Sequence, residues 1–242
     1  MEIIYDGKTK RILSDGEKVL LQFKDTVTGD ARGKLDTGGD FVVGSVEGKG
    51  VASAKVAVYF FKLLNEFGVA THFRRMHSDA EIEVSLAAKI PLEVIYRAKA
   101  FGSFLIRYKG RVEPMAQLDL IEFNLKDDAL KDPLMTSQAI VKLGLASEDE
   151  LERMEAMARK IASVVVKALA DKGLEFVDMK LEFGRADGEL LMVDELSGDT
   201  MRVHDKIQKR MIDQMELARK LDLTWSASRL HFPRVLGNPY RR

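Results

Sequence analysis

The segment that most constrains this chain is residues 177–185, in which apolar and polar side chains alternate from Val177 to Phe183. Successive side chains of a β-strand point to opposite faces, so this period of two predicts a strand. One face would carry charges of both signs and the other only apolar side chains: Asp178, Lys180 and Glu182 against Met179, Leu181 and Phe183. A charged face of mixed sign above a fully apolar one indicates a functional surface.

A second apolar run, residues 190–193, follows the turn signal Asp187-Gly188 and leads into Asp194 and Glu195. Two extended runs joined by Asp-Gly predict a β-hairpin. The hairpin would bring two further carboxylates close to the charged face of the first strand.

The numbering of the apolar residues predicts how the two strands pair. Leu191 and Val193 are odd, like the apolar residues of the first strand, and directly opposite residues share a face. We therefore expect odd residues to pair with odd ones, which needs an odd-length loop or a bulge. Glu182 and Asp194 would then lie opposite or diagonal on the polar face, whereas a plain two-residue turn would separate them.

Two neighbouring carboxylates suggest a magnesium site. Mg²⁺ is usually held by one or two carboxylates together with substrate phosphates, which would make Glu182 and Asp194 its ligands. The alternative is a solvated strand face with ion pairs, and this pattern alone leaves both open.

Charge and cysteine content exclude several classes of protein. The chain has 38 basic and 38 acidic residues among 242, so net charge provides no general attraction to nucleic acid or to an anionic membrane. It contains no cysteine, which excludes disulfides, thiolate metal sites and a cysteine nucleophile, and fits a reducing compartment. No apolar run is long enough to span a bilayer and the first residues lack signal-peptide features, so we expect a cytoplasmic protein.

Helix and strand signals are intermixed without a regular βαβ alternation. This predicts an α+β fold with mostly antiparallel sheets. A capping box at residues 147–150 opens a long predicted helix that ends at Gly173. Further strands are predicted at residues 2–5, 11–13, 18–23, 72–75, 82–85 and 92–99, and further helices at 51–67 and 205–221, before a tail with Pro233 and Pro239.

Several basic segments are candidate phosphate sites. Lys8 and Lys10 lie in a predicted turn whose Gly7 leaves backbone N–H groups free to hold phosphate, although a basic hairpin turn is the simpler reading. Arg97 with the Gly-Ser turn at Ser103 suits a phosphate clamp, or a cationic strand edge. The charged residues 124–128 and the glycine-rich residues 29–34 and 48–50 indicate substrate loops or ordinary connections.

Taken together, these segments resemble a known family. Residues 5–10, 91–97 with 102–103, 176–184 and 194–202 are similar to ordered motifs of the phosphoribosylaminoimidazole-succinocarboxamide synthases, or SAICAR synthetases. The resemblance runs over most of the chain, and residues 176–184 match the most specific motif in full. Departures from the family pattern, which bear on pocket shape rather than reaction class, are Tyr96, Ala98, Phe101, Gly198 and the pair Val51-Ala52.

The resemblance implies ATP- and Mg²⁺-dependent ligation of L-aspartate to carboxyaminoimidazole ribonucleotide (CAIR) in purine biosynthesis. It also implies a homodimer with a small β-rich domain, residues 1–88, and a larger α+β domain, residues 89–242. ATP would bind in the cleft between them, in an outline related to ATP-grasp enzymes and kinases.

Roles carry over by position in the family motifs. Lys8, Lys10, Lys89 and Lys126 would contact ATP, and Glu182 and Asp194 would bind Mg²⁺. Arg97, Ser103 and Arg202 would clamp the CAIR phosphate, Asp178 would contact the ribose and Asp199 would belong to the same substrate site. Lys180 would face the reacting carboxylate and form the catalytic group with Glu182 and Asp194, while Asp132 and residues 29–34 are candidates for L-aspartate.

Two other functions fit the same nucleotide site. A small-molecule kinase would form ADP and a phosphorylated product without aspartate. A non-catalytic nucleotide-binding protein would bind ATP without turnover.

Overall fold

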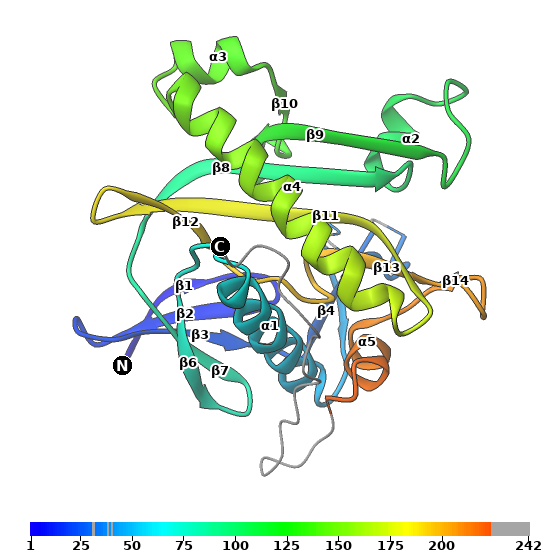
Figure 1. The fold of residues 1–242 in the computed structure, drawn as a ribbon. Helices are drawn as coiled ribbons and strands as arrows, with labels where there is room; N and C mark the ends of the chain where they lie inside the picture. The colour runs from blue at the N-terminus through cyan, green and yellow to red at the C-terminus, as the bar shows by residue number, and fades with distance from the viewer. Residues whose placement is uncertain (31, 38, 40, 224–242) are drawn as a thin grey trace, which may run out of the picture.

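The computed structural model describes residues 1–30, 32–37, 39 and 41–223, and it contains two large antiparallel sheets (Figure 1). The first sheet has the order β1-β2-β3-β7-β6. Its strands are β1 (Glu2–Asp6), β2 (Lys10–Ser14), β3 (Val19–Phe23), β7 (Glu81–Val84) and β6 (Phe73–Ser78), and a separate pair joins β4 (Thr26–Gly29) to β5 (Phe41–Ser45).

The second sheet has the order β10-β9-β8-β11-β13-β14, with β12 also paired to β11. Its strands are β8 (Ala88–Lys99), β9 (Gln117–Leu125), β10 (Leu134–Met135), β11 (Leu174–Ala186), β12 (Glu189–Val193), β13 (Met201–Asp205) and β14 (Arg210–Met211). The helices are α1 (Lys49–Glu66), α2 (Ser103–Arg107), α3 (Ser137–Lys142), α4 (Glu148–Ala170) and α5 (Gln214–Lys220), with a 3₁₀ turn at Asp128–Leu130. This confirms the predicted α+β class.

The long helix α4 begins at the predicted capping box. Ser147 Oγ accepts a hydrogen bond from the Glu150 backbone N–H at 3.2 Å, and Glu150 Oε2 accepts one from the Ser147 N–H at 2.9 Å. These bonds satisfy two helix-end donors. The helix crosses β8 and β11, and its buried stripe packs on their apolar face (Figure 1).

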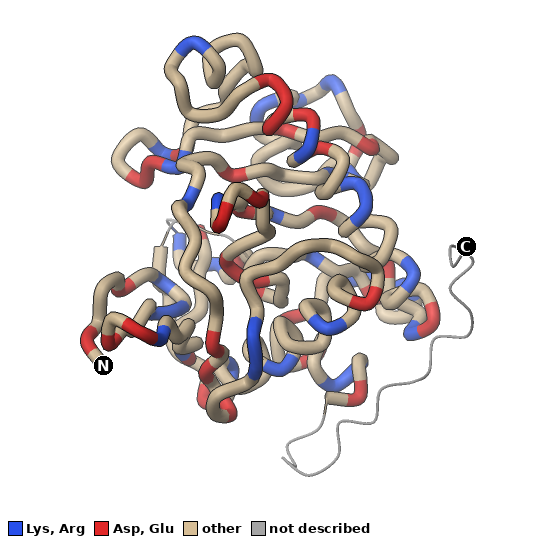
Figure 2. The backbone as a smooth tube through the Cα atoms, turned by 60° about the vertical axis from the view of Figure 1, so that its left-hand side comes forward, with Lys and Arg blue, Asp and Glu red and all other residues tan. Residues whose placement is uncertain are grey.

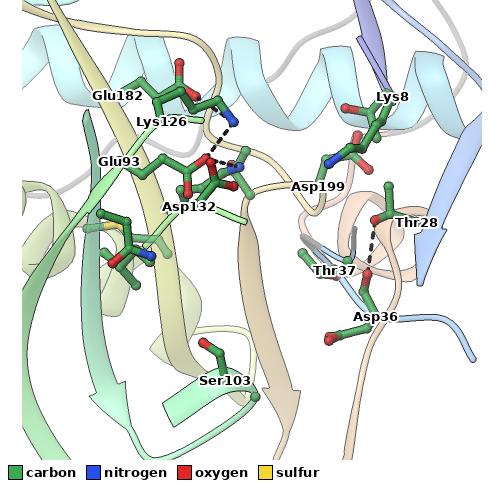
Figure 3. Close-up of a pocket in the computed structure, with 18 of the residues that line it drawn as sticks. Lys8, Thr28, Asp36, Thr37, Glu93, Ser103, Lys126, Asp132, Glu182 and Asp199 are labelled. Carbon is green, nitrogen blue, oxygen red and sulfur yellow. Dashed lines mark hydrogen bonds and ion pairs between the residues drawn. The ribbon is translucent and has the colours of Figure 1, made fainter. Parts of the chain in front are cut away.

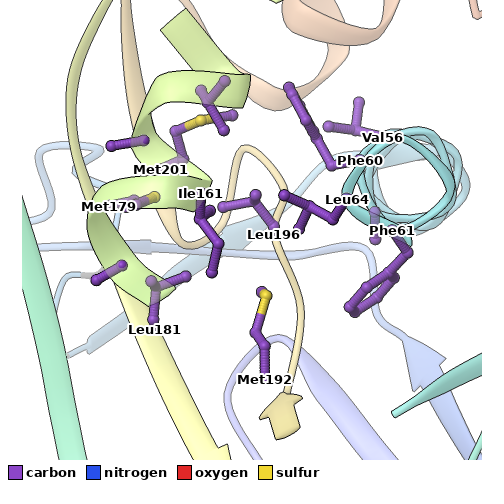
Figure 4. Close-up of a cluster of buried hydrophobic side chains, with 14 of the residues drawn as sticks. Val56, Phe60, Phe61, Leu64, Ile161, Met179, Leu181, Met192, Leu196 and Met201 are labelled. Carbon is purple, nitrogen blue, oxygen red and sulfur yellow. The ribbon is translucent and has the colours of Figure 1, made fainter. Parts of the chain in front are cut away.

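The apolar side of β11 lies in the core, as its alternation predicted. Met179, Leu181 and Phe183 are each at most 1% exposed. Figure 4 shows Met179 and Leu181 near Ile161 of α4, with side chains of α1 across the same cluster. One continuous core therefore joins elements from both halves of the chain, and the division into domains at residue 88 stays a prediction.

The predicted register of the β11–β12 hairpin is wrong. Glu182 pairs with Val193 and Phe183 with Met192, so odd residues oppose even ones. The reason is the turn: Asp187 and Gly188 both have positive φ, 52° and 79°, which makes the two-residue turn that matches the twist of a hairpin.

The predicted helix at residues 205–221 is correct only in its second half. Asp205 Oδ1 accepts hydrogen bonds from the N–H groups of Ile207 and Gln208, which forms a turn between β13 and β14. Helix α5 begins later, where the Asp213 carboxylate caps the Glu216 N–H at 2.7 Å. The tail with Pro233 and Pro239 lies outside the described residues.

Both signs of charge are interspersed along the chain in Figure 2. Across the described residues, no helix combines the length and the apolar character needed to cross a membrane.

Candidate functional site

Three adjacent strands place charged side chains in rows on one side of the second sheet. In the first row Asn124 of β9 lies opposite Glu93 of β8, which lies opposite Glu182 of β11. A later row pairs Arg97 of β8 with Asp178 of β11. We call this surface the polar face and define it as Glu93, Arg97, Glu122, Asn124, Asp178, Lys180 and Glu182.

A cavity of about 450 Å³ lies against the polar face. Its other wall includes Lys8 of the β1–β2 turn, Lys10 at the start of β2 and Thr28 of β4. In Figure 3, Glu93, Lys126 and Glu182 lie on one side, across the cavity from Lys8 and Thr28. The first sheet thus supplies cations opposite the carboxylates of the second sheet.

Glu93 is a central site residue that the sequence prediction missed. Its Oε1 accepts hydrogen bonds from Lys126 Nζ at 2.7 Å and Lys180 Nζ at 2.9 Å. Burial alone would raise the pKa of Glu93, but the charges of Lys180 and Lys126 hold that pKa below its usual value. Glu93 has the same parity as Arg97 on the predicted strand, so the signal that places it on this face was present in the sequence.

Asp194 reaches the cavity although the predicted register is wrong. Strand β12 ends at Val193, and Asp194 then adopts a left-handed conformation with φ 66°. Its Oδ1 lies 2.5 Å from Lys10 Nζ, which also lies 2.7 Å from Glu195 Oε1. Burial would lower the pKa of Lys10, but these two carboxylates raise it well above its usual value.

Glu182 has the features expected of a cation ligand. It is 3% exposed, forms an ion pair with Lys89, and has Lys126 Nζ 3.9 Å from its Oε1. Its buried Oε2 is the oxygen that forms this ion pair with Lys89 Nζ. Glu182 and Asp194 both line the cavity, and their hard oxygen atoms suit Mg²⁺ when phosphates complete the shell. The described residues contain no cluster of three or more acidic, histidine or cysteine side chains that could hold a metal ion.

Arg97 is buried in a network rather than exposed at a strand edge. Its guanidinium donates to Glu122 Oε2 at 2.6 Å, to Asp178 Oδ2 at 3.2 Å and to Ser103 Oγ at 2.9 Å. Arg107 donates to the other Glu122 oxygen at 2.5 Å, so Glu122 orients two arginines. The sequence prediction found Arg97, Ser103 and Asp178 but missed Glu122.

Arg202 joins this network from β13. It donates to Asp178 Oδ2 at 2.9 Å, to Asp36 Oδ1 at 3.0 Å and to the Thr37 carbonyl at 2.8 Å. Burial raises the pKa of Asp178, although both arginines oppose that rise. The predicted clamp and ribose contact are therefore brought together, and Asp36 is a further partner that gave no recognisable sequence signal.

Asp199 has a different environment from the other predicted substrate residues. Its carboxylate accepts hydrogen bonds from Lys49 at 2.7 Å, Ser53 at 2.8 Å and Gln214 at 3.0 Å, which ties α1 to α5. A side chain at Gly198 would collide with Gln214, because a Cβ there would lie 2.9 Å from its Cα. These bonds favour a structural contribution, and contact of Asp199 with substrate stays a prediction.

The remaining loop predictions lie at the rim of the cavity. Lys8 Nζ lies 3.2 Å from Asp128 Oδ1. Asp132 lines the cavity, and its Oδ1 accepts a hydrogen bond from the Asp127 N–H at 2.8 Å. Gly29 and Asp30 also line it, while residue 31 of that predicted loop lies outside the described residues.

Two departures from the family pattern have clear positions. The Arg202 guanidinium lies 5.6 Å from the centre of the Phe101 ring, so this aromatic residue supports the predicted clamp by a cation–π contact. Tyr96 donates a hydrogen bond to Asp119 at 2.6 Å and stacks on Phe176, and its own side chain is not among those that line the cavity. The change at Tyr96 therefore leaves the cavity lining unaltered.

Comparisons with known proteins agree with this geometry. A family profile described as SAICAR synthetase matches residues 3–222. The chain is 41% identical over 205 residues to a phosphoribosylaminoimidazole-succinocarboxamide synthase of Pyrobaculum aerophilum, covering 84% of this chain and 83% of the relative.

Solved structures agree as well. The crystal structure of the synthase from Ehrlichia chaffeensis matches with a TM-score of 0.83 at 27% identity, covering 93% of this chain and 100% of that one. A SAICAR synthetase in complex with ADP matches with a TM-score of 0.78 at 32% identity, covering 90% of each chain.

Proposed function

The chain belongs to the SAICAR synthetase family, and on this premise we propose that its cavity joins L-aspartate to the carboxylate of CAIR, with ATP converted to ADP and phosphate. The observation that carries the proposal is the polar face, which combines carboxylates and cations and lies across the cavity from Lys8 and Lys10. The relative in complex with ADP supports an adenine nucleotide as the energy source.

The chemistry explains why such a site needs no protein nucleophile. A carboxylate is a poor acylating agent, and transfer of the ATP γ-phosphoryl group to CAIR would give an acyl phosphate. The amine of L-aspartate would attack the carbonyl carbon of this acyl phosphate and form a C–N bond. Phosphate would leave with the electron pair of the broken C–O bond, and the nitrogen would release one proton to solvent. The protein must position the reactants and neutralise charge, and positioning alone can supply about 7–11 kcal/mol.

Lysines from both sheets would bind the ATP phosphates. Lys8 lies in the β1–β2 turn and Lys10 is the first residue of β2, whereas Lys89 lies on β8 and Lys126 directly follows β9. Glu182 and Asp194 would hold Mg²⁺, which when bound supplies charge neutralisation on the phosphates. Lys180, whose Nζ is oriented by Glu93 at 2.9 Å, would face the CAIR carboxylate.

The arginine network would receive the ribonucleotide. Arg97, Ser103 and Arg202 would bind its phosphate, since a planar guanidinium suits bidentate phosphate contacts. Asp178 already lies between the two arginines, within hydrogen-bond distance of each, and would contact the ribose. The L-aspartate site would include Asp132 at the rim. A homodimer and a cytoplasmic location stay predictions.

One assay tests the proposal. The protein is incubated with ATP, Mg²⁺, CAIR and L-aspartate, each is omitted in turn, and both ADP and the succinocarboxamide product are measured. We expect product only in the complete mixture. ADP and a phosphorylated compound formed at the full rate without aspartate would instead identify a kinase, and binding of ATP without turnover would identify a non-catalytic protein.

A further inference from the structure

In a regular continuation of strand β12, the side chain of Asp194 would point away from the cavity. If β12 continued past Val193 in its observed register, Asp194 would lie opposite Leu181 and share the apolar face. Its φ of 66° breaks the alternation and sends the carboxylate into the cavity instead. A residue with a Cβ adopts this left-handed conformation at a cost, so contacts from the surrounding structure must hold it there.

The side chain of His72 supplies such a contact. Its Nε2 lies 2.8 Å from the Asp194 carbonyl oxygen. A carbonyl can only accept, so Nε2 is the nitrogen that carries the proton.

His72 is itself fixed on three sides. The backbone N–H of His72 donates to the Met192 carbonyl at 3.0 Å, and the backbone carbonyl of His72 accepts a hydrogen bond from the Ser85 N–H at 2.7 Å. The ring is 5% exposed and lies 5.6 Å from the Phe61 ring. The segment that leads into the first sheet therefore holds the imidazole rigidly beside the end of β12.

We propose that His72 is a positioning residue, whose hydrogen bond to the Asp194 carbonyl holds that residue left-handed and directs its carboxylate to the same cavity as Glu182. This inference rests on the proposed function, in which the two carboxylates hold the divalent ion. It assigns a task to a histidine that contacts neither nucleotide nor ribonucleotide in the proposed arrangement.

The test measures metal binding directly. Mn²⁺ replaces Mg²⁺, and its binding in the presence of ADP is followed by electron paramagnetic resonance. The thermal unfolding of each variant is measured in parallel. His72→Leu removes the donor and should weaken Mn²⁺ binding about 10- to 100-fold, as loss of a group that orients a metal ligand usually does. His72→Gln keeps an N–H donor at similar reach and should stay within a few-fold of the wild type.

A double-mutant cycle shows whether His72 acts through Asp194. In an Asp194→Asn background the further effect of His72→Leu on Mn²⁺ binding should disappear. His204→Leu, at a partly buried histidine of β13 outside the cavity lining, is the matched control and should leave Mn²⁺ binding unchanged.

Unchanged Mn²⁺ binding in His72→Leu, or an effect that persists fully in the Asp194→Asn background, would overturn the inference. If His72→Leu does not fold, His72→Gln is compared with His72→Asn, whose amide is too short to reach Asp194, and equal Mn²⁺ binding by these two would also refute it. The readout needs neither CAIR nor aspartate, so failure of the ligase assay would be distinguishable from failure of this inference.

Discussion

Glu93 and Glu182 lie directly opposite each other on β8 and β11, each only 3% exposed. Like charges in that arrangement repel, and Lys126 offsets the repulsion with its Nζ 2.7 Å from Glu93 and 3.9 Å from Glu182. The site thus contains cations that balance its carboxylates before any ligand binds. Substitutions here should affect both activity and stability, and the two need separate measurement.

Replacing either proposed metal ligand should abolish most activity without unfolding the protein. We expect Glu182→Gln and Asp194→Asn to lower kcat by about 10²–10³-fold. The reason is that an uncharged amide holds Mg²⁺ less tightly than a carboxylate does, and Mg²⁺ would neutralise the charge on the phosphates. Steady-state rates and thermal unfolding would be measured together. Asp119→Asn is the control, since that carboxylate contacts Tyr96 and Arg159 outside the cavity lining. Near-wild-type rates in both site variants would remove the metal assignment.

Removing Lys126, which lies between Glu93 and Glu182, should change how the free energy of unfolding depends on pH. The pKa of Glu93 is lowered in the folded protein, so its ionisation contributes stability above about pH 4.5 that is lost as pH falls through the lower folded pKa. In Lys126→Met that pKa should rise, and the free energy of unfolding should fall most near pH 7.

Urea unfolding at pH 7, 5 and 4 would measure the difference in the free energy of unfolding between the wild type and Lys126→Met. This difference should become smaller below pH 4.5 as Glu93 becomes protonated. Lys8→Met, which breaks a partly exposed pair with Asp128, should change stability little at any pH. A deficit for Lys126→Met that is constant with pH would contradict the explanation.

The predicted phosphate clamp is best tested with a substitution that leaves the buried arginine network intact. Arg97→Ala would leave Glu122 and Asp178 as buried, less compensated carboxylates, and should cost about 3–5 kcal/mol of stability. Ser103→Ala removes only a hydroxyl and should raise the KM for CAIR several-fold more than the KM for ATP. Equal changes in the two KM values would argue against a ribonucleotide phosphate at this position.

Asn124 should show a conflict between stability and activity. Its Oδ1 is buried at the cavity and has no hydrogen-bond partner in the described part of the protein, an arrangement that costs about 1–3 kcal/mol. Asn124→Leu should therefore raise the melting temperature while raising the KM for CAIR or for aspartate, because a bound substrate would supply the missing donor. A lower melting temperature with unchanged KM values would refute this expectation.

The sequence by itself predicted the elements whose signals are local. The alternation of residues 177–183 predicted β11 and its buried face, and the Ser147–Glu150 box predicted the start of α4, because period and capping depend on residues a few positions apart. Parity also placed Asp178, Lys180 and Glu182 together, and each lines the cavity.

Tertiary structure decided how these parts meet. The hairpin register followed the two-residue turn at Asp187-Gly188 and not the numbering of the apolar residues. Asp194 lines the cavity because its own backbone is left-handed, with its carbonyl hydrogen-bonded to His72. Glu122 and Asp36 became partners of the arginines across 25 and 166 positions of chain. Such contacts depend on how whole sheets pack, which no local pattern of side chains records.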